Sequence, residues 1–140
     1  MADKTANRRT MERYTSEFLT TGDVALAEEF VSQDIVMYYP GQPELRGLDT
    51  LLASSPRTAT RSPTSCGWVE QMTADGDTVA VRYSMTGTHR GSFAGIQPTG
   101  AAVVSQSMAF YRLNDGMIVE ERAQLDMLGI LQQLGAAPSA

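Results

Sequence analysis

The chain has 140 residues, of which 42% are hydrophobic and 19% charged, as in an ordinary globular domain. Sixteen acidic residues against eleven lysines and arginines give a net charge of −5, which argues against nucleic-acid binding and against attachment to anionic lipid. A single cysteine, Cys66, and a single histidine, His89, exclude an internal disulfide and a zinc site built from several such residues.

The amino-terminal stretch MADKTANRRTMERYT lacks the apolar core of a signal peptide, and no apolar stretch is long enough to span a bilayer. We therefore expect a cytoplasmic protein with no membrane partner. The sequence contains no internal repeat, low-complexity tract or linker, so residues 1–140 are predicted to form a single domain.

Helices are predicted first along the chain. Apolar residues at three- and four-residue spacing, among them Met11, Tyr14 and Phe18, predict a first helix that ends near TTGD. Asp23 is placed to cap a second helix that carries apolar residues as far as Val31. DIVMYYP predicts a short strand, LDTLLASSP one or two helical turns, and residues 56–67 an exposed loop.

Strands are predicted in the second half. WVEQMTADGD and TVAVRYSMTGTH flank a turn at 75–77, and VVSQSMAFYRL and MIVEERAQLD flank Asn-Asp-Gly at 114–116, so two hairpins are expected. A short helix over 128–134 follows. This order is typical of the α+β class, and a curved antiparallel sheet with helices on one face leaves a mostly apolar pocket, the usual form of a small-molecule site.

Three stretches resemble the SnoaL-like polyketide cyclases of the nuclear-transport-factor-two-like superfamily. They are GDTVAVRYSMTGTHRGSFAGIQPTG, FYRLNDGMIVEERAQLD and YYPGQPELRG. The resemblance covers nearly the whole chain and implies a cone-shaped curved antiparallel sheet whose amino-terminal helices enclose a ligand cavity. It also implies a homodimer or homotetramer, a hydrophobic polyketide substrate and no cofactor.

The resemblance further implies a reaction. Members of the family close a ring of aromatic polyketide esters by intramolecular aldol condensation in antibiotic biosynthesis, and the acid that ends the last strand takes a proton from carbon. Asp126 occupies that position. Other members assist ring hydroxylation, so hydroxylation, epoxide opening and non-catalytic binding or dimerisation stay open. Relatives often carry Phe-Pro-Asp where this chain reads 62-SPT-64, which lowers the expectation of hydroxylation, and Glu-His-Trp where it reads 120-EER-122.

Alternation along the last strand leaves two settings for Asp126 open. It shares one face with Glu120, Arg122 and Gln124, whereas Val119, Ala123 and Leu125 share the other. If the polar face lines the cavity, apolar walls suit Asp126 to act as a general base, and Gln124 or Gln106 holds a substrate oxygen. If that face meets water, Asp126 caps the last helix instead.

The other candidates also have two interpretations. Arg122 is either an electrophilic contact for a substrate carbonyl or an exposed residue paired with a neighbouring glutamate. His89 is either a proton-transfer group or the support of a glycine-rich turn. Arg112 is expected at the turn or in an ion pair. The predicted catalytic residues are Asp126 and Gln124, no metal ligand is predicted, and the predicted substrate-binding residues are Arg122, Gln106, Met108, Phe110, His89, Tyr39 and Trp68.

Overall fold

The structure is a computed structural model that describes residues 3–19, 21, 23–54 and 66–136. Its helices are α1 (Lys4–Arg13), the π-helical segment η1 (Tyr14–Leu19), α2 (Val24–Phe30), α3 (Leu48–Ser54) and α5 (Met127–Gln133). The Ser62–Pro63–Thr64 stretch, with most of the loop predicted around it, lies outside the described residues.

Six strands form one sheet in the order β2-β1-β6-β5-β4-β3. They are β1 (Val31–Tyr38), β2 (Leu45–Arg46), β3 (Cys66–Asp75), β4 (Thr78–Thr88), β5 (Ala102–Asn114) and β6 (Met117–Leu125). Four of the neighbouring pairs are antiparallel, but β1 runs parallel to β6. The sheet is therefore mixed rather than purely antiparallel. The second helix also ends one residue earlier than predicted, because Val31 already has extended backbone angles and begins β1.

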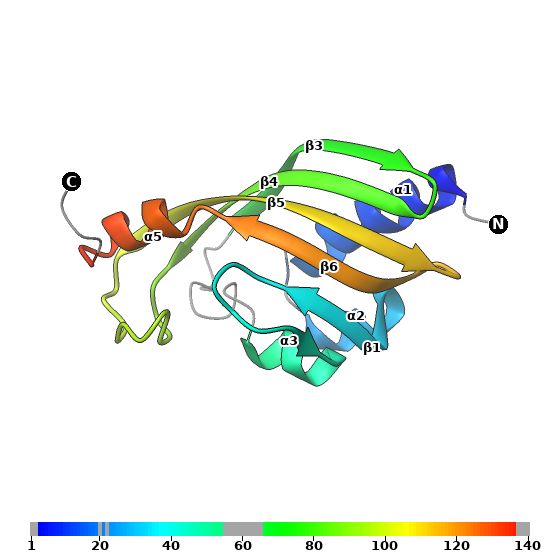
Figure 1. Cartoon of the computed structure of the whole chain (residues 1–140). Helices are drawn as coiled ribbons and strands as arrows, with labels where there is room; N and C mark the ends of the chain where they lie inside the picture. Colours follow the sequence, from blue (N-terminus) through cyan, green and yellow to red (C-terminus); the bar gives the residue numbers. More distant parts are fainter. Residues whose placement is uncertain (1–2, 20, 22, 55–65, 137–140) are drawn as a thin grey trace.

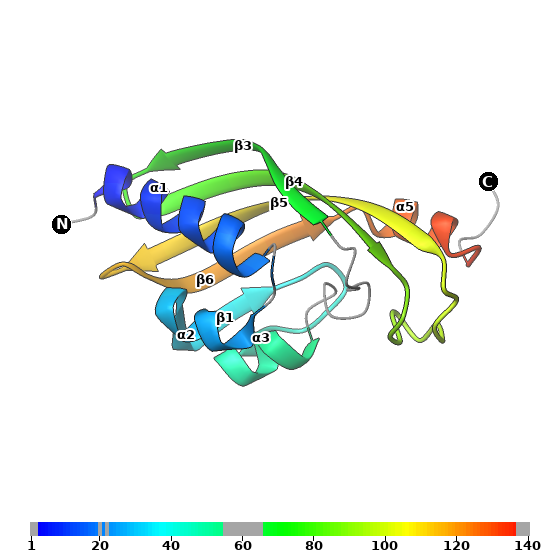
Figure 2. The same ribbon diagram turned by 180° about the vertical axis from the view of Figure 1, so that it is seen from behind.

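The helices lie on one face of the curved sheet. Figures 1 and 2 show α1, α2 and α3 together on the concave side, whereas α5 follows the end of β6 and lies beside the first part of β5, where Gln133 bonds the backbone of Val104. None of the described helices covers the opposite, convex face. This arrangement confirms the α+β class and the amino-terminal helices packed on a curved sheet.

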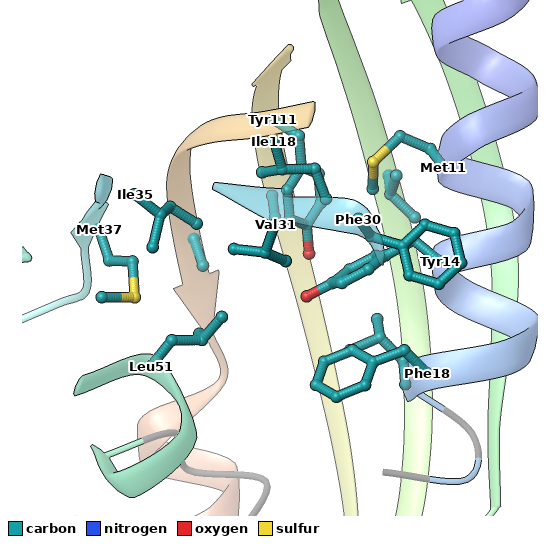
Figure 3. Close-up of a cluster of buried hydrophobic side chains, with 14 of the residues drawn as sticks. Met11, Tyr14, Phe18, Phe30, Val31, Ile35, Met37, Leu51, Tyr111 and Ile118 are labelled. Carbon is teal, nitrogen blue, oxygen red and sulfur yellow. The ribbon is translucent and has the colours of Figure 1, made fainter. Parts of the chain in front are cut away.

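The main core lies between the helices and the concave face. Tyr14 is its centre, because its ring is 5.3 Å from that of Phe18, 6.0 Å from Phe30 and 5.8 Å from Tyr111 on β5. Figure 3 shows these rings meeting the side chains that β1 and β6 contribute. Aromatic pairs in this range add to the stability gained from burial alone.

Two features of the β5–β6 hairpin determine which side chains of β6 point toward the core. Asp115 and Gly116 both have positive φ, 51° and 76°, which confirms the predicted turn and explains its Asn-Asp-Gly sequence. The register then shifts, since Leu113 pairs with Ile118 but Arg112 pairs with Glu120. This bulge at Val119 turns both Ile118 and Glu121 toward the core.

Candidate functional site

A cleft of about 820 Å³ lies between the α1–η1 segment and the edge of the sheet at β3 and β4. Trp68, Met72, Tyr83 and Met85 give it aromatic and thioether walls. The volume lies within the range of small-molecule pockets, and such walls suit a flat, largely apolar ligand. The remaining lining residues are Arg8, Glu12, Thr15, Ser16, Leu19, Gly67, Val69, Glu70 and Gln71.

The charged groups of this cleft are held by neighbours. Trp68 Nε1 donates to Glu70 Oε1 at 2.6 Å, and Ser84 Oγ donates to the same oxygen at 3.1 Å. Across the cleft, Arg8 is 3.0 Å from Glu12 and also donates to a strand carbonyl. Trp68 is thus a cleft-lining residue whose ring position is fixed by Glu70, and its role in substrate binding stays a prediction.

A second acid, Glu121, lies in the interior. Its side chain points to the concave face and is fully buried, and Tyr39 Oη donates to its Oε2 at 3.3 Å. Neighbouring strands place Tyr111 and Met37 beside it. A buried carboxylate next to a phenol is a pair that can take a proton and give one back. Glu121 is not among the site residues predicted from the sequence, although alternation places it on the same face of the strand as Ala123 and Leu125.

Asp126 does not lie in an apolar cavity. It is exposed, and its Oδ1 accepts the backbone N–H of Gly129 at 2.9 Å, so it is the N-cap of α5. The expectation of an apolar setting is therefore wrong for the folded chain, because the polar face of β6 is its convex face. The alternative, a capping aspartate, is confirmed.

The other predicted residues on these strands share that convex face. Arg122 is 3.0 Å from Glu120 and stacks over the Tyr38 ring, with 3.8 Å between its guanidinium carbon and the ring centre. Arg112 is 3.2 Å from Glu120, which confirms the ion pair considered for it. These contacts agree with Arg122 as an exposed, glutamate-paired residue. The predicted residues exposed with it are Gln124, Gln106, Met108 and Phe110.

His89 and Tyr39 face inward, as substrate-binding residues would, yet each has a structural contact. His89 is fully buried, and its Nδ1 accepts the backbone N–H of Thr99 at 3.1 Å. Because Nδ1 is an acceptor, the ring hydrogen lies on Nε2. That nitrogen has no hydrogen-bond partner among the described residues. His89 thereby supports the loop between β4 and β5, while the hydroxyl of Tyr39 contacts Glu121.

Within the described part of the chain, no group of three or more His, Cys, Asp or Glu side chains gathers as metal ligands would. No helix within it is long and apolar enough to cross a membrane.

Several solved protein structures share this fold and part of this amino-acid sequence. A candidate SnoaL-like polyketide cyclase from Jannaschia sp. CCS1 shares the fold, with a TM-score of 0.81 and 24% identity over 96% of this chain and 95% of that one. AclR, a candidate hydroxylase from Streptomyces galilaeus, has a TM-score of 0.79 and is 26% identical over 99% of this chain and 90% of its own.

IdmH, a candidate polyketide cyclase from Streptomyces antibioticus, is 27% identical over 92% of this chain and 98% of its own, with a TM-score of 0.74. No curated protein sequence matches the chain. The family of SnoaL-like polyketide cyclases matches residues 9–134, which is most of the sequence. With its curved sheet and concave-side helices, the chain therefore belongs to the SnoaL-like polyketide cyclase family.

Proposed function

We propose that this protein catalyses a cofactor-free, base-assisted ring closure of an aromatic polyketide intermediate. Membership of the family and 27% identity to IdmH support the substrate class. The observation that carries the proposal is the buried Glu121 carboxylate, to which the Tyr39 hydroxyl donates. The cytoplasmic location expected from the sequence stays a prediction.

In this proposal Glu121 acts as the base and Tyr39 as the acid. Glu121 removes a proton from a carbon flanked by carbonyls, and the carbanion attacks a second carbonyl of the same molecule. The new alkoxide takes a proton from Tyr39, which Glu121 then restores, so the product is an isomer of the substrate. A single positioned acid–base residue contributes on the order of 10²–10⁴ in rate.

The cleft is proposed to hold the rest of the ring system. Tyr83 lines the cleft and belongs to the same hydrophobic core cluster as Tyr39 and Tyr111. Trp68 and Met85 offer flat and polarizable contact to fused rings. Because Glu121 is fully buried, the substrate must displace inner side chains to reach it.

The test compares three variants with the parent protein. Each is incubated without cofactor with a tricyclic anthraquinone polyketide ester, and isomeric products are separated by mass-resolved chromatography. We expect activity in the parent, a loss of about 10²–10⁴ in Glu121→Gln, a smaller loss in Tyr39→Phe, and parental activity in Asp126→Asn. Asparagine also caps helices, so Asp126→Asn is the matched control: it removes a carboxylate five residues after Glu121 and keeps the cap of α5.

Other results separate the alternatives. Activity that is lost in Asp126→Asn and kept in Glu121→Gln would restore the base predicted from sequence. A parent protein that matches buffer would reject ring closure of this substrate class.

Ligand binding without catalysis is the second candidate function, because both cleft acids, Glu12 and Glu70, are already held by neighbours. It is favoured if the ester raises the melting temperature of an inactive parent. Trp68→Ala should then abolish that rise.

A further inference from the structure

We propose that the cleft between the α1–η1 segment and the edge of the sheet selects a flat ring ligand with a positive charge, such as a protonated or quaternary ring nitrogen. The inference starts from the indole of Trp68 and the carboxylate of Glu70, which lie together on the cleft wall. It rests on the proposed function for one point, that the cleft holds a ring system, and it does not depend on the chemistry at Glu121.

The indole of Trp68 is the only indole in the chain, and it is open to a ligand. Its side chain is 45% exposed although it lines the cleft. Indole is the aromatic side chain that attracts a cation most strongly, and the thioethers of Met72 and Met85 on the same wall are polarizable. A neutral ring can stack on this wall, but a positively charged ring is attracted to it more strongly.

The carboxylate of Glu70 carries a charge that no side chain of the described residues compensates. Its Oε1 accepts from Trp68 Nε1 at 2.6 Å and from Ser84 Oγ at 3.1 Å, and both donors are neutral. None of the ion pairs among the described residues includes Glu70, and no hydrogen bond among them reaches its Oε2. Two neutral donors therefore hold this carboxylate in place and leave one oxygen for a ligand.

The other charges on the cleft wall cancel. Arg8 and Glu12 are the remaining charged residues that line it within the described chain, and Arg8 Nε lies 3.0 Å from Glu12 Oε1. Arg8 also donates to the carbonyl oxygen of Met72, so its guanidinium is held between α1 and β3. One positive and two negative side chains leave the wall with a net charge of −1, which comes from Glu70.

A positive charge beside Trp68 is attracted by both groups. Because the indole N–H donates to Glu70, the carboxylate lies at the edge of the ring, and a ligand stacked on the indole face brings its own charge close to Glu70. Opposite charges about 4 Å apart near a protein surface change a dissociation constant by about tenfold or more. A ligand carboxylate is repelled by the same group. If the proposed ring closure also holds, its substrate carries a basic nitrogen.

The test uses the fluorescence of Trp68, which reports on the cleft because the chain has no other tryptophan. The parent chain is titrated at mildly alkaline pH with three probes of one ring size: N-methylacridinium, neutral acridine and acridine-9-carboxylate. We expect saturable quenching by the cation, with a dissociation constant about tenfold below that of acridine, and the weakest binding for the carboxylate. High salt should reduce the preference for the cation.

The variant Glu70→Gln separates the charge from the shape of the cleft. A glutamine oxygen can still accept from Trp68 and Ser84, so the ring keeps its support while the charge is lost. This variant should bind the cation about tenfold more weakly and acridine with unchanged affinity. Glu28→Gln is the matched control, since it makes the same change at an exposed position of α2 that does not line the cleft. It should leave all three dissociation constants unchanged, and circular dichroism confirms that both variants are folded.

The outcomes separate this inference from the proposed reaction. Equal affinities for the cation and acridine in the parent, or equal effects of Glu70→Gln and Glu28→Gln, would overturn the charge preference and would not bear on ring closure. Absence of quenching by any probe would overturn it too, because Trp68 would then be closed to ring ligands. Cation-selective quenching in a protein that does not convert the ester would support the inference and reject the proposed reaction.

Discussion

The Asp126 carboxylate accepts the backbone N–H of Gly129 at 2.9 Å, so the acid that follows the last strand is the first hydrogen-bonding group of the last helix. A carboxylate in this place satisfies one of the free N–H groups that every helix start exposes. Its negative charge is also favourable at that end of the helix.

The effect of a substitution at Asp126 on the free energy of unfolding should therefore depend on whether the new side chain can cap a helix. Asp126→Ala removes the acceptor and should lower the free energy of unfolding by about 1 kcal/mol, whereas Asp126→Asn should change it little. Urea unfolding followed by circular dichroism measures both. Equal loss in the two variants would mean that the charge, rather than the acceptor, stabilises α5.

A substitution at Gly129, whose N–H donates to Asp126, should disturb the same capping hydrogen bond. A Cβ at this position would lie 2.2 Å from Asp126 Oδ2 and 2.7 Å from its Cγ, so the carboxylate must turn away. Alanine is better than glycine inside a helix by about 1 kcal/mol, but in the parent chain this gain is offset by loss of the cap.

Gly129→Ala is thus expected to stabilise the Asp126→Ala chain by about 1 kcal/mol and the parent chain by much less. The two free energies of unfolding, compared in a double-mutant cycle, measure this coupling. Equal effects in both backgrounds would show that the carboxylate and Gly129 do not interact.

His89 should be required for the loop between β4 and β5. His89→Ala leaves the partly buried N–H of Thr99 without its protein acceptor, which should cost about 1 kcal/mol, while His89→Asn can still offer an oxygen near the place of Nδ1 and should cost less. Chemical denaturation gives both values. If the two variants are equally unstable, packing of the ring rather than its acceptor nitrogen is what the loop needs.

The pair formed by Tyr38 and Glu44 should make stability depend on pH at both extremes. Tyr38 Oη donates to Glu44 at 2.9 Å, which lowers the pKa of Glu44 below 4.5 and raises the pKa of Tyr38 above 10.0. A lowered carboxyl pKa contributes stability above the unfolded value that is lost as the pH falls through the folded one. A raised phenol pKa contributes stability below the unfolded value that is lost as the pH rises through the folded one.

Tyr38→Phe removes this hydrogen bond and keeps the ring on which Arg122 stacks. The parent should therefore melt slightly above the variant between about pH 5 and pH 9, and the difference should shrink toward both extremes. Glu44 is exposed and Tyr38 is only half-buried, so a small difference is expected. A difference that does not vary with pH would show that the hydroxyl acts in some other way.

The sequence predicted much of the fold because the local signals agree with it. Alternation and turn residues predicted both long hairpins, and the Asn-Asp-Gly turn is where the strongest signal placed it. The pairing of β1 with β6 was not predicted, because it joins segments far apart in sequence and no local pattern encodes it. The cap of α5 by Asp126 was predicted as one of two alternatives, since both are compatible with the same strand alternation.

The candidate site was harder to predict than the fold. Alternation separates the two faces of β6, but it does not say which one the helices cover, and the polar face proved to be the convex one. Simple alternation puts Glu121 on the apolar face of Ala123 and Leu125 but Ile118 on the polar face, and the bulge at Val119 turns Ile118 inward as well. A bulge depends on the partner strand and cannot be read from one strand alone.

The parallel pairing of β1 with β6 has a consequence for the order in which the chain folds. The hairpins β3–β4 and β5–β6 join neighbours in sequence and can form early, but Val36 meets Glu120 only after a long intervening segment has closed. The edge of the sheet at β1 and β2 therefore waits for the last strand to be synthesised. A nascent chain without β6 would leave one edge of β1 unpaired, because β2 can pair only with the other edge, and pairings of this range slow folding.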